Sequence, residues 1–176
     1  MKFHPTTLQD AVLIDLERRG DDRGFFARTF CVDEFSAHGL PIQFVQQNTS
    51  YSASKGTLRG MHFQRAPHGE DKLIRCLRGE IVDIIIDLRP NSPTYKKWEA
   101  FELNDENKRQ LLVPKGFAHG FQTVSDHVEV TYLVSAKYTP SAEGGVRWND
   151  PAFGITWPLT PTEMSDKDRN WPDFTG

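Results

Sequence analysis

The segment Leu73–Leu88 reads LIRCLRGEIVDIIIDL and carries the clearest structural signal in the chain. It contains two short runs, Leu73–Leu77 and Glu80–Leu88, that are rich in apolar and β-branched residues and therefore predict β-strands. Arg78 and Gly79 separate the two runs, and a two-residue link that ends in glycine predicts a tight hairpin. The centre of the protein is expected to be β-sheet.

Similar short runs lie on both sides of this segment. They occur at Ala11–Leu16, Phe25–Phe30, Phe44–Asn48, Thr57–Gln64, Trp98–Leu103, Gln110–Val113, Gly120–Val124 and Val128–Ser135. Only Val32–His38, which ends before Gly39, resembles a short helix. About ten short strands with a minor helix predict an all-β protein, and long antiparallel pairings favour a jelly-roll barrel with a ligand at its mouth.

Composition narrows the class of protein. The 176 residues are 38% hydrophobic and 26% charged, and no repeat or linker divides them, so a single domain over residues 1–176 is expected. A net charge of −3 argues against a nucleic-acid partner. No apolar run approaches the roughly 20 residues of a membrane helix, and Met1–Asp10 lacks the apolar stretch of a signal peptide. A cytoplasmic protein with no membrane partner is expected.

The first histidine of interest is His62, in the run Thr57–Gln64. Strict alternation along a strand would place His62 and Arg59 on opposite faces. Gly60 lies between them and would permit a bulge, which would turn both side chains towards one cavity. The alternative is a surface histidine on an edge strand.

The second histidine, His119, lies in PKGFAHGF, and its P-x-G-x-x-H spacing resembles the second metal-binding motif of the cupin superfamily. The first cupin motif would offer H-x-H followed by a glutamate, but this chain has His62-Phe63-Gln64, with Glu70 further on. A ligand set of His62, Glu70 and His119 has fewer imidazoles than usual, and glutamine is a weak ligand for transition metals. A metal-dependent oxygenase stays an alternative.

Lys72 and Tyr132 are candidates for proton transfer. Alternation places Tyr132 on one apolar face with Val128, Val130 and Val134. Such a tyrosine is often core packing with a satisfied hydroxyl, and Lys72 could equally be a solvated charge.

A group of polar and aromatic residues suits a nucleotide ligand. Arg23 and Arg59 could together bind a diphosphate, because a guanidinium bonds two phosphate oxygens at once. Phe26 could stack on a base, and Gln46 and Asn48 could add hydrogen bonds. The alternative for Arg23 is a surface ion pair with its neighbour Asp22, which would contribute little.

These motifs resemble, in order and spacing, the dTDP-4-dehydrorhamnose 3,5-epimerases from about Pro5 to Phe174. The matching segments are Asp22–Phe26, Gln46 with Asn48 and Ser50, Gly56–Gln64, Lys72-Leu73, Pro114–Phe121, Tyr132, Tyr138–Pro140 and Ser165–Asp168. The resemblance implies a cupin-type jelly roll that is usually a homodimer and uses neither a metal nor a nicotinamide cofactor. It also implies a nucleotide-linked 4-keto-6-deoxyglucose as substrate, with both carbons beside the ketone inverted on the way to L-rhamnose.

The resemblance also implies a role for each candidate residue. For catalysis it implies His62 as the base, Asp168 as its carboxylate partner, Tyr132 as the acid on the other face and Lys72 near the developing enolate. The positions that would line the nucleotide-sugar site are Arg23, Phe26, Gln46, Asn48, Arg59 and His119.

Two residues depart from the pattern of this family. Arg28 stands where the family commonly has the glutamate of R-G-x-F-x-E, and Glu70 stands where many members have the glutamine of Q-x-K. Alternation would put Arg28 on the same side as Phe26, so it is expected at the site or its rim. A GDP- or CDP-linked sugar, inversion of one carbon only, or a sugar-nucleotide-binding barrel without catalysis therefore stay open.

Overall fold

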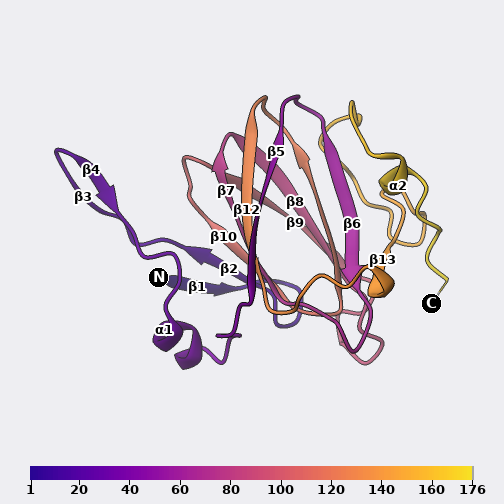
Figure 1. Cartoon of the computed structure of the whole chain (residues 1–176), viewed down its shortest axis with the longest axis horizontal. Helices are drawn as coiled ribbons and strands as arrows, with labels where there is room; N and C mark the ends of the chain where they lie inside the picture. The colour runs from indigo at the N-terminus through magenta and orange to yellow at the C-terminus, as the bar shows by residue number, and fades with distance from the viewer. Residues whose placement is uncertain (176) are drawn as a thin grey trace.

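The computed structural model describes residues 1–175 and shows two antiparallel β-sheets packed face to face (Figure 1). The six-stranded sheet has the order β1 (Lys2–Pro5), β2 (Val12–Asp15), β10 (Gln110–Val113), β7 (Lys72–Arg78), β12 (Val128–Val134) and β5 (Gln46–Ser52). The five-stranded sheet has the order β13 (Glu143–Gly145), β6 (Leu58–Gln64), β11 (Phe117–Thr123), β8 (Glu80–Asp87) and β9 (Trp98–Asn104). This arrangement confirms the predicted all-β jelly roll.

The helices are short and peripheral, as predicted. Helix α1 (Val32–Ala37) lies where Val32–His38 indicated a helix, whereas η1 (Pro140–Ala142) and α2 (Asp166–Arg169) had no sequence signal of their own. No helix among residues 1–175 is long and apolar enough to cross a membrane.

The predicted hairpin at Arg78-Gly79 is wrong. β7 pairs with β10 and β12 in one sheet, while β8 pairs with β11 and β9 in the other, so the short link crosses between the sheets. β8 is largely buried and lies inside the five-stranded sheet, where β11 and β9 take both of its edges and leave none for β7. Gly79, with φ +74°, allows the chain to turn sharply at this corner.

Three hydrophobic clusters hold the sheets in place. The first fills the space between the sheets and includes Ile74 of β7 and Ile85 of β8. The second lies on the outer side of the five-stranded sheet around Ile84, and the third lies around Phe35 of α1, against the outer side of the six-stranded sheet. Because alternate residues of one strand enter different clusters, both faces of the central strands are covered.

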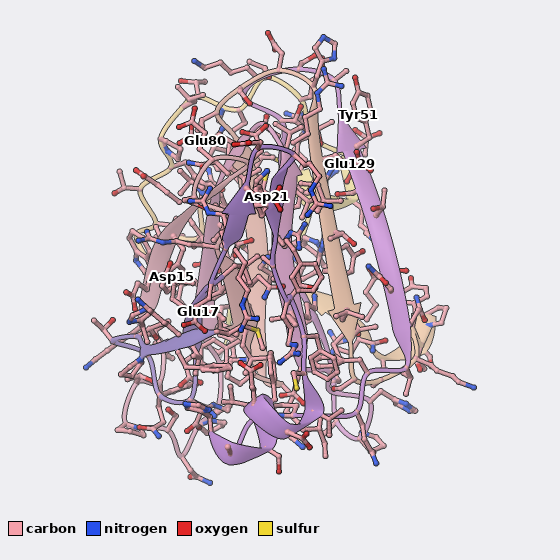
Figure 2. The ribbon with its side chains drawn as sticks, turned by 90° about the vertical axis from the view of Figure 1, so that its left-hand side faces the viewer. Asp15, Glu17, Asp21, Tyr51, Glu80 and Glu129 are labelled. Carbon is pink, nitrogen blue, oxygen red and sulfur yellow. The ribbon has the colours of Figure 1, made fainter. Side chains whose placement is uncertain are left out.

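A two-stranded hairpin, β3 (Arg19–Asp21) and β4 (Gly24–Phe26), stands away from both sheets (Figure 1). Figure 2 views the molecule from this side, and Asp21 lies on the hairpin in front of the six-stranded sheet. The prediction for Arg28 is wrong for the single chain: β4 ends at Phe26, and Arg28 instead donates a 2.9 Å hydrogen bond to Glu34 of α1. The Glu34 carboxylate therefore holds Arg28 against α1, and Arg28 does not line the pocket described below.

Candidate active site

A β-bulge in β6 brings Arg59 and His62 to the same pocket. His62 is opposite His119 and Arg59 is opposite Phe121, so β6 has an extra residue between these two pairs. Gly60 lies in the bulge with φ +139°, and a Cβ there would be 2.5 Å from a backbone atom of β11. Only glycine fits this position, and the bulge that it predicted is confirmed.

The pocket lies between the two sheets and has a volume of about 610 Å³, which suits a small organic ligand. Its polar lining comes from β5, β6, β11, β12 and the C-terminal segment, and includes Ser50, Arg59, His62, His119, Tyr132 and Asp168. The structure therefore brings together predicted site residues that are far apart in the sequence.

His62 and Asp168 form a close pair. Nε2 of His62 lies 2.6 Å from Oδ1 of Asp168, and the second carboxylate oxygen accepts the N–H of Gly60 at 3.2 Å. An ionised carboxylate only accepts hydrogen bonds, so the proton of the imidazole lies on Nε2 and Nδ1 keeps its lone pair. In this pair the carboxylate of Asp168 orients the imidazole of His62, which is the arrangement of a general base.

Hydrogen bonds between the C-terminal segment and β6 hold Asp168 in position for this contact. The backbone N–H of Leu58 donates to the carbonyl of Glu163, and the hydroxyl of Ser165 caps α2 by accepting the N–H of Asp168. Burial alone would raise the pKa of Asp168, but the hydrogen bonds that it accepts from His62 and from the N–H of Gly60 help to outweigh burial and lower it. Asp168 is therefore an anion near neutral pH.

Trp171 supports the His62 ring and had not been singled out in the sequence. The two rings meet edge to face, with centroids 6.3 Å apart. Trp171 also packs against Gly145, where an added Cβ would lie 2.3 Å from the indole. A lone tryptophan near the C-terminus has no spacing that could predict this contact.

His119 belongs to a second histidine–aspartate pair. Its Nε2 lies 2.9 Å from Oδ2 of Asp83, a fully buried residue of β8. Asp83 was missed, although an aspartate within the apolar run Glu80–Leu88 was itself a signal, because a buried carboxylate needs a partner. This pair fixes the imidazole of His119 at the wall of the pocket.

Tyr132 and Lys72 lie on the inner side of the six-stranded sheet. Tyr132 lines the pocket, and burial, together with the charge of Glu70, raises the pKa of its phenol, while Arg59 lowers it less. Lys72 is not a solvated charge: its side chain is only 11% exposed, and its Nζ lies 3.3 Å from Oε1 of Glu70. Lys72 lies near the pocket but is not among the residues that line it.

β5 carries the predicted polar pair Gln46 and Asn48. Nε2 of Gln46 donates to Oδ1 of Asn48 at 2.9 Å, and Asn48 is directly opposite Tyr132. Ser50 follows on the same face, and its buried hydroxyl has no hydrogen-bond partner within residues 1–175. Arg59 is held beside β5 by the carbonyl of Tyr51 and by a second bond to the strand.

Arg23 and Phe26 do not lie at the pocket of their own chain. Both are on the β3–β4 hairpin, where the side chain of Arg23 is 88% exposed and Phe26 is 69% exposed. Arg23 pairs with Asp21 rather than with Asp22. The single chain therefore lacks two of the residues that the motifs assign to its nucleotide-sugar site.

The three residues of the metal-site alternative each have a separate partner. His62 is bonded to Asp168, His119 is bonded to Asp83, and Glu70 pairs with Lys72. In the described part of the chain, no three side chains of the metal-binding types are grouped so that they could hold an ion.

The barrel and the pocket identify a cupin-type enzyme, and comparison with known proteins identifies its family. The family model for dTDP-4-dehydrorhamnose 3,5-epimerase matches residues 5–176. A dTDP-4-dehydrorhamnose 3,5-epimerase of Methanothermobacter thermautotrophicus is 46% identical over 97% of this chain and 92% of its own. The chain belongs to the dTDP-4-dehydrorhamnose 3,5-epimerase family, as its motifs predicted.

Solved structures agree with this assignment. The crystal structure of dTDP-4-dehydrorhamnose 3,5-epimerase from Bacillus anthracis, with TDP and PPi bound, has a TM-score of 0.95 and 46% identity, covering 98% of this chain and 99% of that one. The Legionella pneumophila enzyme in complex with dTDP-4-keto-L-rhamnose has a TM-score of 0.92 and 36% identity, covering 98% and 92%. The predicted cupin-type fold is thus confirmed.

Proposed function

We propose that this protein inverts C3 and C5 of a dTDP-linked 4-keto-6-deoxyglucose by removing and returning protons. The observation that carries the proposal is the placement of the His62–Asp168 pair and Tyr132 in one pocket, with His62 and Tyr132 on strands of different sheets. Incubation of the protein with the 4-keto sugar in deuterium oxide tests it, because inversion by proton exchange must leave solvent deuterium on each inverted carbon.

The first step is proton removal beside the ketone. Nδ1 of His62 accepts the proton, and the carboxylate of Asp168 stabilises the resulting imidazolium through Nε2. Histidine is the side chain that enzymes use most often for this kind of proton transfer. As the proton leaves, negative charge develops on the ketone oxygen.

That charge needs fixed donors or cations nearby. His119 is held in the pocket wall by Asp83. Lys72 lies on the neighbouring strand β7, on the same inner face as Tyr132. A donor fixed before the reaction stabilises the enolate without reorganising, and its effect is largest where water is excluded. The ketone already present in the substrate makes the neighbouring C–H bonds acidic, so removal and return of a proton involves no change of oxidation state.

Inversion requires that the proton return from the other face of the sugar. Tyr132 is on β12 of the six-stranded sheet, whereas His62 is on β6 of the five-stranded sheet, so a sugar between the sheets has one group on each side. The raised pKa of Tyr132 keeps its phenol protonated at neutral pH, which suits a proton donor.

The nucleotide would lie towards the mouth of the pocket. Arg59 provides a guanidinium there for the diphosphate, and the unpartnered hydroxyl of Ser50 offers a further hydrogen bond. The relatives that bind TDP or a dTDP-sugar support dTDP over CDP or GDP.

We also propose that the protein works as a homodimer in which each β3–β4 hairpin completes the site of its partner. A hairpin of two three-residue strands is too small to be stable alone, and it exposes Phe25 and Phe26. Beside it, the outer side of the six-stranded sheet has a hollow of about 270 Å³ lined in part by Arg75, whose Nε is buried without a partner in the described chain. A second subunit on this side would cover both features.

Subunit mixing tests the shared site. The variants His62→Ala and Arg23→Ala/Phe26→Ala, carrying different tags, are co-expressed and the mixed dimer is purified. If the hairpin acts on the partner, the mixed dimer has one intact site, and we expect its kcat/KM to be about half that of the native dimer. If each hairpin served its own chain, the mixed dimer would be no more active than the two parent variants.

We also propose a cytoplasmic location and a single domain, as the sequence predicts. A nucleotide-linked substrate supports a cytoplasmic location, since nucleotides are made there. β7 contributes residues to the first and third hydrophobic clusters, and β8 contributes to the first and second. Because shared strands join the three clusters, they support one domain over residues 1–176.

A further inference from the structure

Glu70 is a buried carboxylate that the reaction described above does not use. Its side chain is 12% exposed, and its two oxygens have different partners. Oε1 lies 3.3 Å from Nζ of Lys72, and Oε2 accepts a hydrogen bond of 3.2 Å from Nε2 of Gln64. Gln64 is itself fixed, because its Oε1 accepts the backbone N–H of Thr139 at 2.7 Å. The carboxylate is thus held in one place from two sides.

The partners of Glu70 belong to strands that carry the reaction. Gln64 ends β6, two residues after His62, and Lys72 begins β7. Lys72 is directly opposite Val134 on β12, so its side chain shares the inner face with Tyr132, two residues earlier. A fixed negative charge at this point acts on both the ammonium and the phenol.

Resting on the proposed function, we infer that Glu70 is a positioning residue for proton return: its carboxylate holds the Lys72 ammonium on the inner face beside Tyr132 and neutralises its charge. A cation beside a phenol favours the phenolate, which cannot donate a proton. A carboxylate that neutralises this cation has the opposite effect. Without Glu70, the free ammonium of Lys72 and the guanidinium of Arg59 would both favour the phenolate.

The other charges around Tyr132 do not replace Glu70. The strands around the pocket place four other ionisable side chains near Tyr132, which are Arg59, His62, Lys72 and His119. Across the pocket, the C-terminal segment adds Glu163, Lys167 and Asp168. Of the two carboxylates in the C-terminal segment, Asp168 is bonded to His62. Burial raises the pKa of the Tyr132 phenol most, and the charge of Glu70 raises it further.

The test is the variant Glu70→Gln, which keeps the size of the side chain and removes its charge. Ultraviolet absorbance detects phenolate, and the difference between each protein and its Tyr132→Phe derivative isolates the titration of Tyr132. We expect Tyr132 to ionise at lower pH in Glu70→Gln than in the native protein. We also expect kcat at about pH 9.5, relative to its maximum, to fall roughly threefold further than in the native enzyme.

Asp71→Asn is the matched control. Asp71 is the adjacent carboxylate, but it accepts bonds from the backbone of Lys115 and from Ser135, away from the phenol. We expect the titration of Tyr132 to be unchanged in this variant. If Asp71→Asn shifted it as much as Glu70→Gln does, the effect would be one of net charge and the inference would be wrong.

An unshifted titration in Glu70→Gln would also overturn the inference. A purely structural role would lower kcat equally at every pH and leave the titration in place. Glu70→Asn removes the same charge and provides the test if Glu70→Gln does not fold. Because the absorbance titration needs no substrate, its outcome is independent of whether the 4-keto sugar is converted.

Discussion

His62→Ala is expected to abolish deuterium uptake at both C3 and C5 of the 4-keto sugar. The pocket has one imidazole that is bonded to an anionic partner and backed by an indole ring, and both proton removals would pass through it. Removal of a general base typically costs about 10²-fold to 10⁴-fold in rate, and we expect a loss of at least this size. Hydrogen–deuterium exchange of the substrate, followed by nuclear magnetic resonance, measures it.

The control for this variant is His4→Ala. His4 pairs with Asp15 at the edge of the six-stranded sheet, so its removal should leave exchange unchanged. dTDP affinity should be close to native in His62→Ala, because the imidazole is not bonded to the nucleotide side of the pocket. The melting temperature should fall somewhat, because the buried Asp168 loses its partner, while the fold is kept. Near-native exchange at either carbon in His62→Ala would show that another group is the base.

Tyr132→Phe is expected to separate the two halves of the reaction. The ring and its packing against Val130 are kept, and only the hydroxyl that returns the proton is lost. Proton removal by His62 continues, so the substrate still takes up deuterium, but inverted product forms about 10²-fold more slowly or not at all. The ratio of exchange to product formation measures this effect.

Tyr95→Phe is the matched loss of a tyrosine hydroxyl far from the pocket, against Phe174, and should behave as the native protein does. If Tyr132→Phe folded normally and turned over normally, Tyr132 would be a core residue, as its apolar neighbours on β12 could suggest.

The sequence predicted the strands better than their partners. Period-two alternation and short apolar runs located β6, β7, β8 and β12 closely, since these signals are local. The pairing of a strand depends on distant segments, and this is why the link at Arg78-Gly79 was predicted as a hairpin but crosses between sheets. The sequence predicted one strand over Phe25–Phe30, whereas β4 ends at Phe26 and pairs with β3, whose residues are polar or glycine and form no apolar run.

The sequence could predict those parts of the candidate site that depend on a local feature, such as a glycine in a strand or a charge in an apolar run. Gly60 indicated the bulge that brings Arg59 to His62, and Asp83 in an apolar run could have indicated the partner of His119. The contact of His62 with Asp168 joins residues 106 positions apart, and only the resemblance to the epimerases suggested it. No spacing rule joins residues at this distance.

The prediction for Arg23 and Phe26 shows a different limit. Their motif matched a nucleotide-sugar site, yet the hairpin holds them away from the pocket of their own chain. A motif records which residues meet the ligand and does not record which subunit provides them. The proposed dimer accounts for both observations.

The central claim is that two carbons are inverted by exchange with solvent in one pocket. The native protein is incubated with dTDP-, CDP- and GDP-linked 4-keto-6-deoxyglucose in deuterium oxide, and the products are examined by nuclear magnetic resonance. We predict deuterium at both C3 and C5 of an inverted product, with the dTDP-linked sugar converted fastest. Deuterium at one carbon only, or no exchange with any of the three substrates, would contradict the account.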